Sequence, residues 1–182
     1  MDLELKTELV RLYGVPFTYA LEKTLGFEGG WARHPSDRGG ETRYGITQPT
    51  LTSFNAFTGL WWTLRGLTRD NAAAIYHRMF WQKMGIWRLP RELQGLMFDW
   101  SVHAGYFAIR SMQRHLKVRP DGAIGPKTLG TLDRMITISG TTVVVRALAI
   151  RRMTHLCRLV RRDRKQGDFL VGWWARVNSF LR

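Results

Sequence analysis

The ionisable residues of one glycine-rich segment, residues 28–47, are the first candidates for chemistry. Glu28 ends an apolar helical pattern between Phe27 and Trp31, so we expect its carboxyl to lie against aromatic rings. Such surroundings disfavour the charged form and keep a proton available near neutral pH. Asp37 and Thr42 come from the far side of the segment and would face Glu28 if the segment folds back. A carboxylic acid opposite a polar cluster suits cleavage of a glycosidic bond.

The same residues also have a purely structural interpretation. A glutamate at the end of a helix is usually solvated, and Asp37 stands close to Gly39-Gly40, where an aspartate commonly forms a turn. Composition and spacing alone therefore leave both a catalytic site and an ordinary solvated loop open.

The segment resembles the signature of glycoside hydrolase family 108, the phage and bacterial N-acetylmuramidases. The matching residues are Glu28-Gly29-Gly30, Asp37-Arg38-Gly39-Gly40, Thr42 and Tyr44-Gly45-Ile46-Thr47. The resemblance implies that this chain hydrolyses the β-1,4 bond between N-acetylmuramic acid and N-acetylglucosamine, with no metal or organic cofactor. It implies the following roles: Glu28 as general acid, Asp37 as general base or water-positioning carboxylate, and Thr42 as a residue that orients the water. We expect Trp31, Tyr44, Gly45 and Thr47 to contact the substrate, with the two aromatic rings stacking on sugars.

The C-terminal half is similar to the predicted peptidoglycan-binding segment of the same family. The similar residues are Asp99-Trp100-Ser101-Val102-His103-Ala104-Gly105, Gln113, Asp121-Gly122, Gly125-Pro126-Lys127-Thr128-Leu129, Gly172-Trp173 and Arg176-Val177. His103 stands where that family leads us to expect asparagine. Together the two resemblances span about residues 16–178 and imply bacterial peptidoglycan as the partner.

Two other functions remain compatible with the sequence. A lytic transglycosylase would also use one catalytic glutamate, but it would release an anhydro sugar and would not need Asp37. A non-catalytic module that binds cell wall or nucleic acid would use the basic residues alone.

The elements that must position these residues are almost all helical. Apolar residues recur at helical spacing in every part of the chain except residues 31–47, which read as an irregular loop or short hairpin. We expect helices at 3–12, 16–28, 48–57, 69–83 capped by Thr68, 90–104, 106–117, a short one from Pro126, 140–165 and 168–180. This predicts a mostly α, lysozyme-like bundle of one domain over 1–182. Its catalytic lobe would span about 14–95 and its peptidoglycan-binding lobe about 96–178.

The charge of the chain is large and uneven. Its 182 residues carry a formal net charge of +14. Residues 1–102 hold 12 Lys/Arg against 10 Asp/Glu, whereas residues 103–182 hold 16 against 4. Since no nucleic-acid reading motif is visible, we expect no nucleic-acid partner. The basic residues of 146–165 would instead hold a monomeric enzyme on an anionic envelope, such as outer-membrane lipid phosphates.

The N-terminus and the apolar stretches of the chain bear on where the protein acts. The start Met1-Asp2-Leu3-Glu4 lacks the basic residues of a signal peptide, and no stretch is long and apolar enough for a membrane span. The resemblance then implies a phage lysis enzyme made in the host cytoplasm, which reaches the periplasm and cell wall through a separate pore. The histidines have no metal spacing. We expect Cys157 and most tryptophans outside residues 28–47 to be packed in the core.

Overall fold

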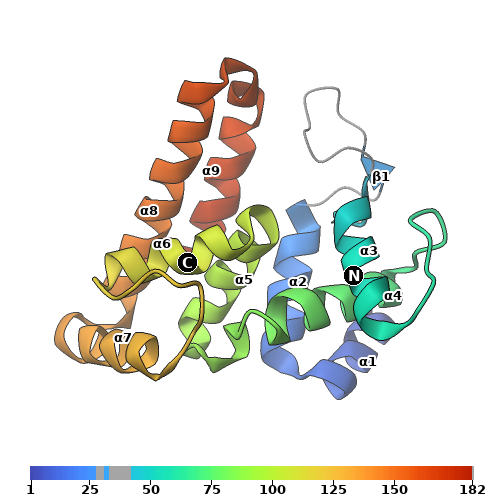
Figure 1. The fold of residues 1–182 in the computed structure, drawn as a ribbon, viewed down its shortest axis with the longest axis horizontal. Helices are drawn as coiled ribbons and strands as arrows, with labels where there is room; N and C mark the ends of the chain where they lie inside the picture. The colour runs from blue at the N-terminus through green and yellow to red at the C-terminus, as the bar shows by residue number, and fades with distance from the viewer. Residues whose placement is uncertain (28–30, 33–41, 182) are drawn as a thin grey trace. The chain divides into compact units, whose positions relative to one another are not determined.

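The protein is described here by a computed structural model, which covers residues 1–27, 31–32 and 42–181. Helices form most of this part of the chain, as predicted (Figure 1). The chain divides into two compact units, Met1–Lys83 and Met84–Arg182. The assignment of catalytic and wall-binding lobes to about 14–95 and 96–178 stays a prediction, because compact packing does not assign an activity. No helix of the described residues is long and apolar enough to cross a membrane.

The first unit begins with two helices, α1 (Leu3–Tyr13) and α2 (Val15–Phe27). The Asp2 carboxylate caps α1 by accepting a hydrogen bond from the Leu5 amide at 2.9 Å. Gly14 joins the helices with φ of 83°, a conformation that favours glycine. Proline in the first turn of α2 agrees with the prediction. The two helices pack together, and Phe17 and Leu21 of α2 are completely buried.

A small antiparallel sheet follows α2. Its strands are β1 (Trp31–Ala32), β2 (Thr42–Arg43) and β3 (Ile46–Thr47), in that order across the sheet. Trp31 pairs with Arg43 and Ala32 with Thr42, while Thr42 and Arg43 pair with Thr47 and Ile46. The predicted short hairpin in this region is therefore confirmed for the described strands.

Helices α3 (Gln48–Thr58) and α4 (Arg69–Tyr76) complete the first unit. Thr68 caps α4 in a reciprocal capping box with Asn71, since each backbone amide donates to the other residue's side chain, at 3.1 and 3.2 Å. The predicted helix over 69–83 then changes into a π-helix at His77–Gln82.

The second unit is built around α5 (Arg91–Ala104), whose Leu93, Leu96, Met97, Phe98 and Trp100 are fully buried. A 3-10 turn, Ile86–Arg88, precedes it. The other elements are α6 (Tyr106–His115), α7 (Pro126–Ser139), α8 (Thr141–Arg162), a 3-10 segment Arg164–Phe169, α9 (Leu170–Asn178) and a last 3-10 turn Ser179–Leu181. Helix α8 packs on α5, α6, α7 and α9, and it runs beside α9 as a hairpin (Figure 1).

Several sequence predictions need correction here. Helix α7 has 14 residues and is not short, and the helix predicted over 140–165 ends at Arg162. Trp81 and Trp100 are core residues, but Trp61, Trp87 and Trp174 are 91%, 57% and 58% exposed. Trp62 and Trp173 are half-buried, so most tryptophans outside residues 28–47 are not core. Cys157 is exposed on α8, because it falls outside the buried face of that helix.

Candidate active site

The predicted catalytic residues differ in what the structure describes of them. Glu28 and Asp37 lie outside the described residues, and so their predicted roles stay predictions. Thr42 lies in β2 and is nearly buried, with an exposed fraction of 9%. Trp31 lies in β1, and its strand position is opposite Arg43. The structure therefore brings Trp31, Thr42 and Thr47 into one small sheet that follows the helix ending at Phe27.

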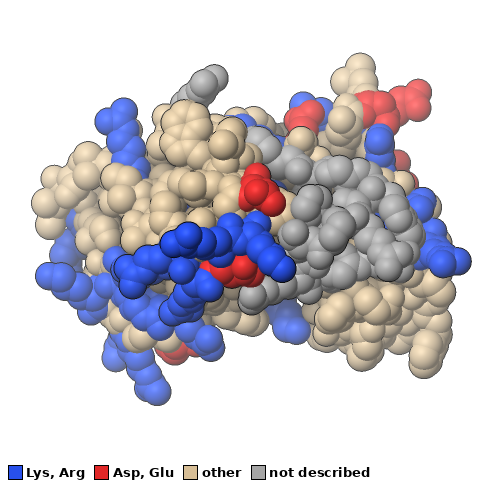
Figure 2. Space-filling view, turned by 90° about the horizontal axis from the view of Figure 1, so that it is seen from above, with Lys and Arg blue, Asp and Glu red and all other residues tan. Residues whose placement is uncertain are grey.

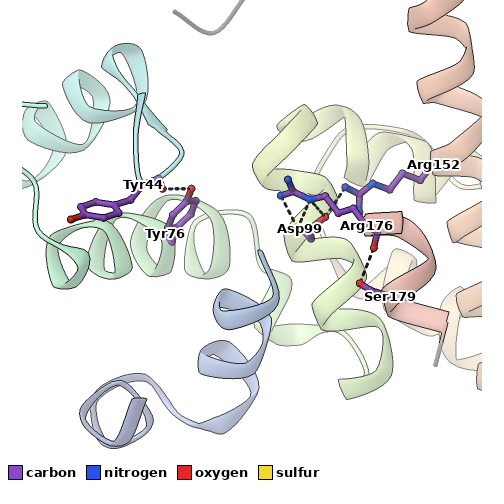
Figure 3. Close-up of polar contacts among 6 residues, drawn as sticks. All are labelled: Tyr44, Tyr76, Asp99, Arg152, Arg176 and Ser179. Carbon is purple, nitrogen blue, oxygen red and sulfur yellow. Dashed lines mark hydrogen bonds and ion pairs between the residues drawn. The ribbon is translucent and has the colours of Figure 1, made fainter. Parts of the chain in front are cut away.

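The connection between β2 and β3 explains two residues of the signature. Tyr44 and Gly45 form this connection with φ of 52° and 73°. A two-residue hairpin turn of type I′ needs positive φ at both positions, which glycine adopts freely and other residues adopt rarely. The strained Tyr44 is held by a hydrogen bond from the Tyr76 hydroxyl to its carbonyl oxygen, at 2.9 Å (Figure 3).

The Tyr44 side chain lies beside Arg43 and borders a cavity. The Arg43 guanidinium lies over its ring at 5.2 Å from the centroid. The ring lines a cavity of 160 Å³ between α1, α2 and α4, together with Leu9, Leu21 and Leu25. This geometry gives Tyr44 a structural role. It does not test the predicted contact between Tyr44 and a sugar.

The end of the signature is structural as well. Ile46 is buried in the core, with an exposed fraction of 1%. Thr47 is the N-cap of α3, and its hydroxyl accepts a hydrogen bond from the Thr50 amide at 3.4 Å. The run Tyr44 to Thr47 thus fixes where β2 stands relative to α3, and β2 carries Thr42.

Two residues that support this sheet were missed by the sequence analysis. Arg43 donates from Nε to the carbonyl oxygen of Leu67 at 2.8 Å, which ties β2 to the segment before α4. Tyr76 is fully buried at the end of α4 and reaches Tyr44 from there. Neither has a local sequence signal, because each partner lies 24 or 32 residues away.

The second unit gives the residues of the C-terminal resemblance a clear role in the fold. Asp99 of α5 is fully buried between two guanidinium groups (Figure 3). Arg152 of α8 lies 2.6 Å from one carboxylate oxygen, and Arg176 of α9 donates from Nε to both oxygens at 2.9 Å. Burial alone would raise the pKa of Asp99, but the two guanidinium groups lower it below its ordinary value.

A second polar network holds the loop between α6 and α7. Gln113 is fully buried and donates from Nε2 to Asp121 Oδ1 at 2.7 Å and to the Ala123 carbonyl at 2.9 Å. Its Oε1 accepts from the Gly122 amide at 2.8 Å. Gly122 has φ of 87°, and a Cβ there would meet the Arg110 side chain at 3.3 Å. Gln113, Asp121 and Gly122 are thus explained by loop geometry.

Metal binding has no support in the described part of the chain. No group of three or more His, Cys, Asp or Glu side chains among residues 1–27, 31–32 and 42–181 is arranged to hold an ion.

Comparison with known proteins agrees with this architecture. Residues 21–105 match the family described as glycosyl hydrolase 108, and residues 107–178 match the predicted peptidoglycan domain. The solved structure of SagA from Brucella abortus is similar, with 28% sequence identity and a TM-score of 0.72. The match covers 91% of this chain and 95% of that chain. No curated protein matches significantly. The mostly α, lysozyme-like fold is confirmed, and the two regions support a peptidoglycan hydrolase.

Proposed function

Because this chain belongs to the glycosyl hydrolase 108 family, we propose that it hydrolyses the β-1,4 bond between N-acetylmuramic acid and N-acetylglucosamine. The observation that carries this proposal is the family match over residues 21–105, which includes Glu28, Asp37 and Thr42. The sheet adds support, since it holds Thr42 nearly buried in β2.

The reaction follows from the proposed roles. Glu28 donates a proton to the glycosidic oxygen as the bond to the leaving sugar breaks. Asp37 accepts a proton from the attacking water, or positions that water, and the Thr42 hydroxyl helps to orient it. When the acid and the base lie on opposite faces of the sugar and a water fits between them, the anomeric centre is inverted. Trp31, Tyr44, Gly45 and Thr47 are proposed to line the sugar subsite.

The identity of the released sugar end tests this mechanism. Purified peptidoglycan is digested with the wild type, and the products are analysed by mass spectrometry. A reducing muramic acid end is expected, and an anhydro end would instead establish a lytic transglycosylase. Glu28→Gln should lower turnover by about 10²-fold or more, because general acid catalysis contributes about 10²–10⁴-fold. Equal lysis by Glu28→Gln and wild type would support a non-catalytic wall-binding module.

The second carboxylate is tested separately. Asp37→Ala should lower turnover without changing the thermal unfolding midpoint, since the predicted role of Asp37 is chemical. Glu41→Ala in the same segment is the matched control and should keep near-normal turnover. A normal rate for Asp37→Ala would contradict the assignment of a base and would favour the transglycosylase.

The biological setting is also a proposal. We propose a monomeric phage lysis enzyme that is made in the host cytoplasm and reaches the periplasm and cell wall through a separate pore. The exposed cations of 146–165 would then concentrate it on an anionic envelope, with no nucleic acid involved. Expression in a Gram-negative host should cause lysis only when a pore-forming protein is expressed with it. Lysis without that pore would contradict the route.

A further inference from the structure

A groove in the second unit lies between α6 and α8. It has a volume of 370 Å³ and falls within the region that matches the peptidoglycan domain. Helix α6 contributes every fourth residue, Phe107, Ser111 and His115, and therefore one face. Helix α8 contributes the facing residues, which are Ala147, Ile150, Arg151, Thr154, His155 and Arg158.

The groove is cationic at fixed positions. Arg151 donates from Nε to the Ser111 carbonyl at 2.9 Å, which anchors its guanidinium on the groove wall. Arg158 is exposed about two turns further along the same face of α8. None of the described residues that line the groove is an aspartate or a glutamate. Among these residues, an anionic group entering the groove would therefore meet two guanidinium groups and no competing carboxylate.

Apolar side chains also line the groove, with Phe107 from α6 and Ile150 from α8. The rings of Phe107 and His155 lie 4.2 Å apart between centroids, with 31° between their planes. Ile150 borders the groove and is 67% exposed, so its side chain is available for an apolar contact there. The groove thus offers small apolar contacts beside positive charge, which a bare sugar would not use.

We propose that this groove binds the stem peptide of peptidoglycan, with Arg151 and Arg158 contacting its carboxylates and Ile150 and Phe107 contacting its alanine methyl groups. The proposal rests on the proposed function, because it takes peptidoglycan as the substrate. It assigns substrate recognition to the second unit and adds a peptide subsite to the sugar subsite of the first.

The direct test is titration of the full-length protein with a synthetic tetrapeptide, L-Ala-γ-D-Glu-diaminopimelyl-D-Ala, in a calorimeter. Arg158→Gln should weaken binding by about tenfold, which corresponds to about 1.4 kcal/mol. Arg134→Gln removes the same charge from an exposed position on α7 that does not line the groove, and it should bind normally. The tetrapeptide with its carboxylates amidated should not bind.

The apolar contact is tested in the same way. Ile150→Ser should weaken tetrapeptide binding, whereas Ile138→Ser, which changes an isoleucine of α7 that is 78% exposed, should not. Both side chains are exposed, so both variants should fold. Equal weakening by the groove variants and their controls would overturn the proposal.

Two further results separate this proposal from its alternatives. If wild type releases reducing sugar ends but does not bind the tetrapeptide, the groove proposal fails and the proposed function stands. If it binds the tetrapeptide but cleaves no glycan, only the proposed function fails. Binding to phosphatidylglycerol vesicles that Arg158→Gln abolishes, without tetrapeptide binding, would assign the groove to lipid phosphate and overturn the proposal.

Discussion

At the scale of single residues, the described part of the candidate site depends on backbone geometry. Thr42 is the one proposed catalytic residue that the structure describes, and its strand is fixed by the turn at Tyr44-Gly45. A tyrosine with φ of 52° is strained, because its Cβ crowds the backbone. The buried Tyr76 hydroxyl offsets that strain by bonding the Tyr44 carbonyl.

Removal of this hydroxyl should have a measurable effect. Tyr76→Phe leaves the ring in the core but removes one hydrogen bond, which should lower the free energy of unfolding by about 1 kcal/mol. Turnover of purified peptidoglycan should also fall, because the turn that positions β2 becomes less restrained. Urea unfolding and a turnover assay measure the two effects. Tyr106→Phe, on an exposed tyrosine, is the control and should change neither. An unchanged unfolding free energy in Tyr76→Phe would contradict the role of this bond.

The sequence predicted the signature residues more readily than what holds them. The Thr68 cap of α4 was predicted from local capping chemistry. Gly45 was predicted only as a substrate contact, and the structure shows that it is a turn residue between β2 and β3. The bonds from Tyr76 to Tyr44 and from Arg43 to Leu67 depend on how α4 packs against the sheet, which no local pattern encodes.

At the scale of elements, apolar periodicity predicted most helices because each helix has one buried face. It did not distinguish the π-helix at His77–Gln82 from a continued α-helix, since the difference is one shifted hydrogen bond per turn. It also overestimated tryptophan burial. Trp61 follows the left-handed Gly59 that ends α3, and Trp174 lies on the outer face of α9, so neither reaches a core.

Asp99 joins three helices, because its carboxylate on α5 pairs with Arg152 of α8 and Arg176 of α9. Asp99→Asn leaves two buried guanidinium groups without their counter-charge. We expect the free energy of unfolding at pH 7 to fall by about 3–5 kcal/mol, as when one member of a buried ion pair is removed. Thermal or urea unfolding measures the change. Asp133→Asn, on the exposed face of α7, is the control and should be nearly neutral.

The lowered pKa of Asp99 also predicts that the free energy of unfolding depends on pH. The pKa of Asp99 is lowered in the folded state despite its burial, because Arg152 and Arg176 favour the carboxylate. The unfolded chain therefore binds the proton first, near the ordinary value of 3.8. The stabilisation by this carboxylate is complete above that pH and is lost as the pH falls through the lower folded value. The difference between wild type and Asp99→Asn should shrink below about pH 4, and a constant difference would contradict the ion pair.

At the scale of the whole molecule, the net charge of +14 has two separate roles. Arg152 and Arg176 lie in the interior of the second unit, where they form ion pairs with Asp99. They are therefore not part of the basic surface. The remaining cations of α8 and the following 3-10 segment are mostly exposed, and Figure 2 shows Lys and Arg side chains gathered on this face. Counting charges along the sequence did not separate these roles, because residues 151 and 152 are neighbours with different partners.

The exposed cations should act through long-range attraction. Four of them, outside the proposed peptide groove, are Arg161, Arg162, Arg164 and Lys165. Changing all four to glutamine should lower the ratio of turnover on whole cell wall to turnover on a short soluble glycan, because only the wall presents a dense anionic surface. The ratio for wild type should also fall as salt rises, since screening at 0.1 M already acts over about 10 Å. In the variant this salt dependence should be weaker.

The control must remove the same charge from elsewhere. Lys117, Arg119, Lys127 and Arg134 are exposed cations of the second unit that lie outside α8 and the following 3-10 segment. If net charge alone draws the enzyme to the wall, both fourfold variants should lose the same fraction of the ratio. If the basic surface acts as a patch, the α8 variant should lose several times more, because closely spaced charges add their potentials within one screening length. Equal losses would therefore leave the net charge as the cause and contradict a wall-facing patch on α8.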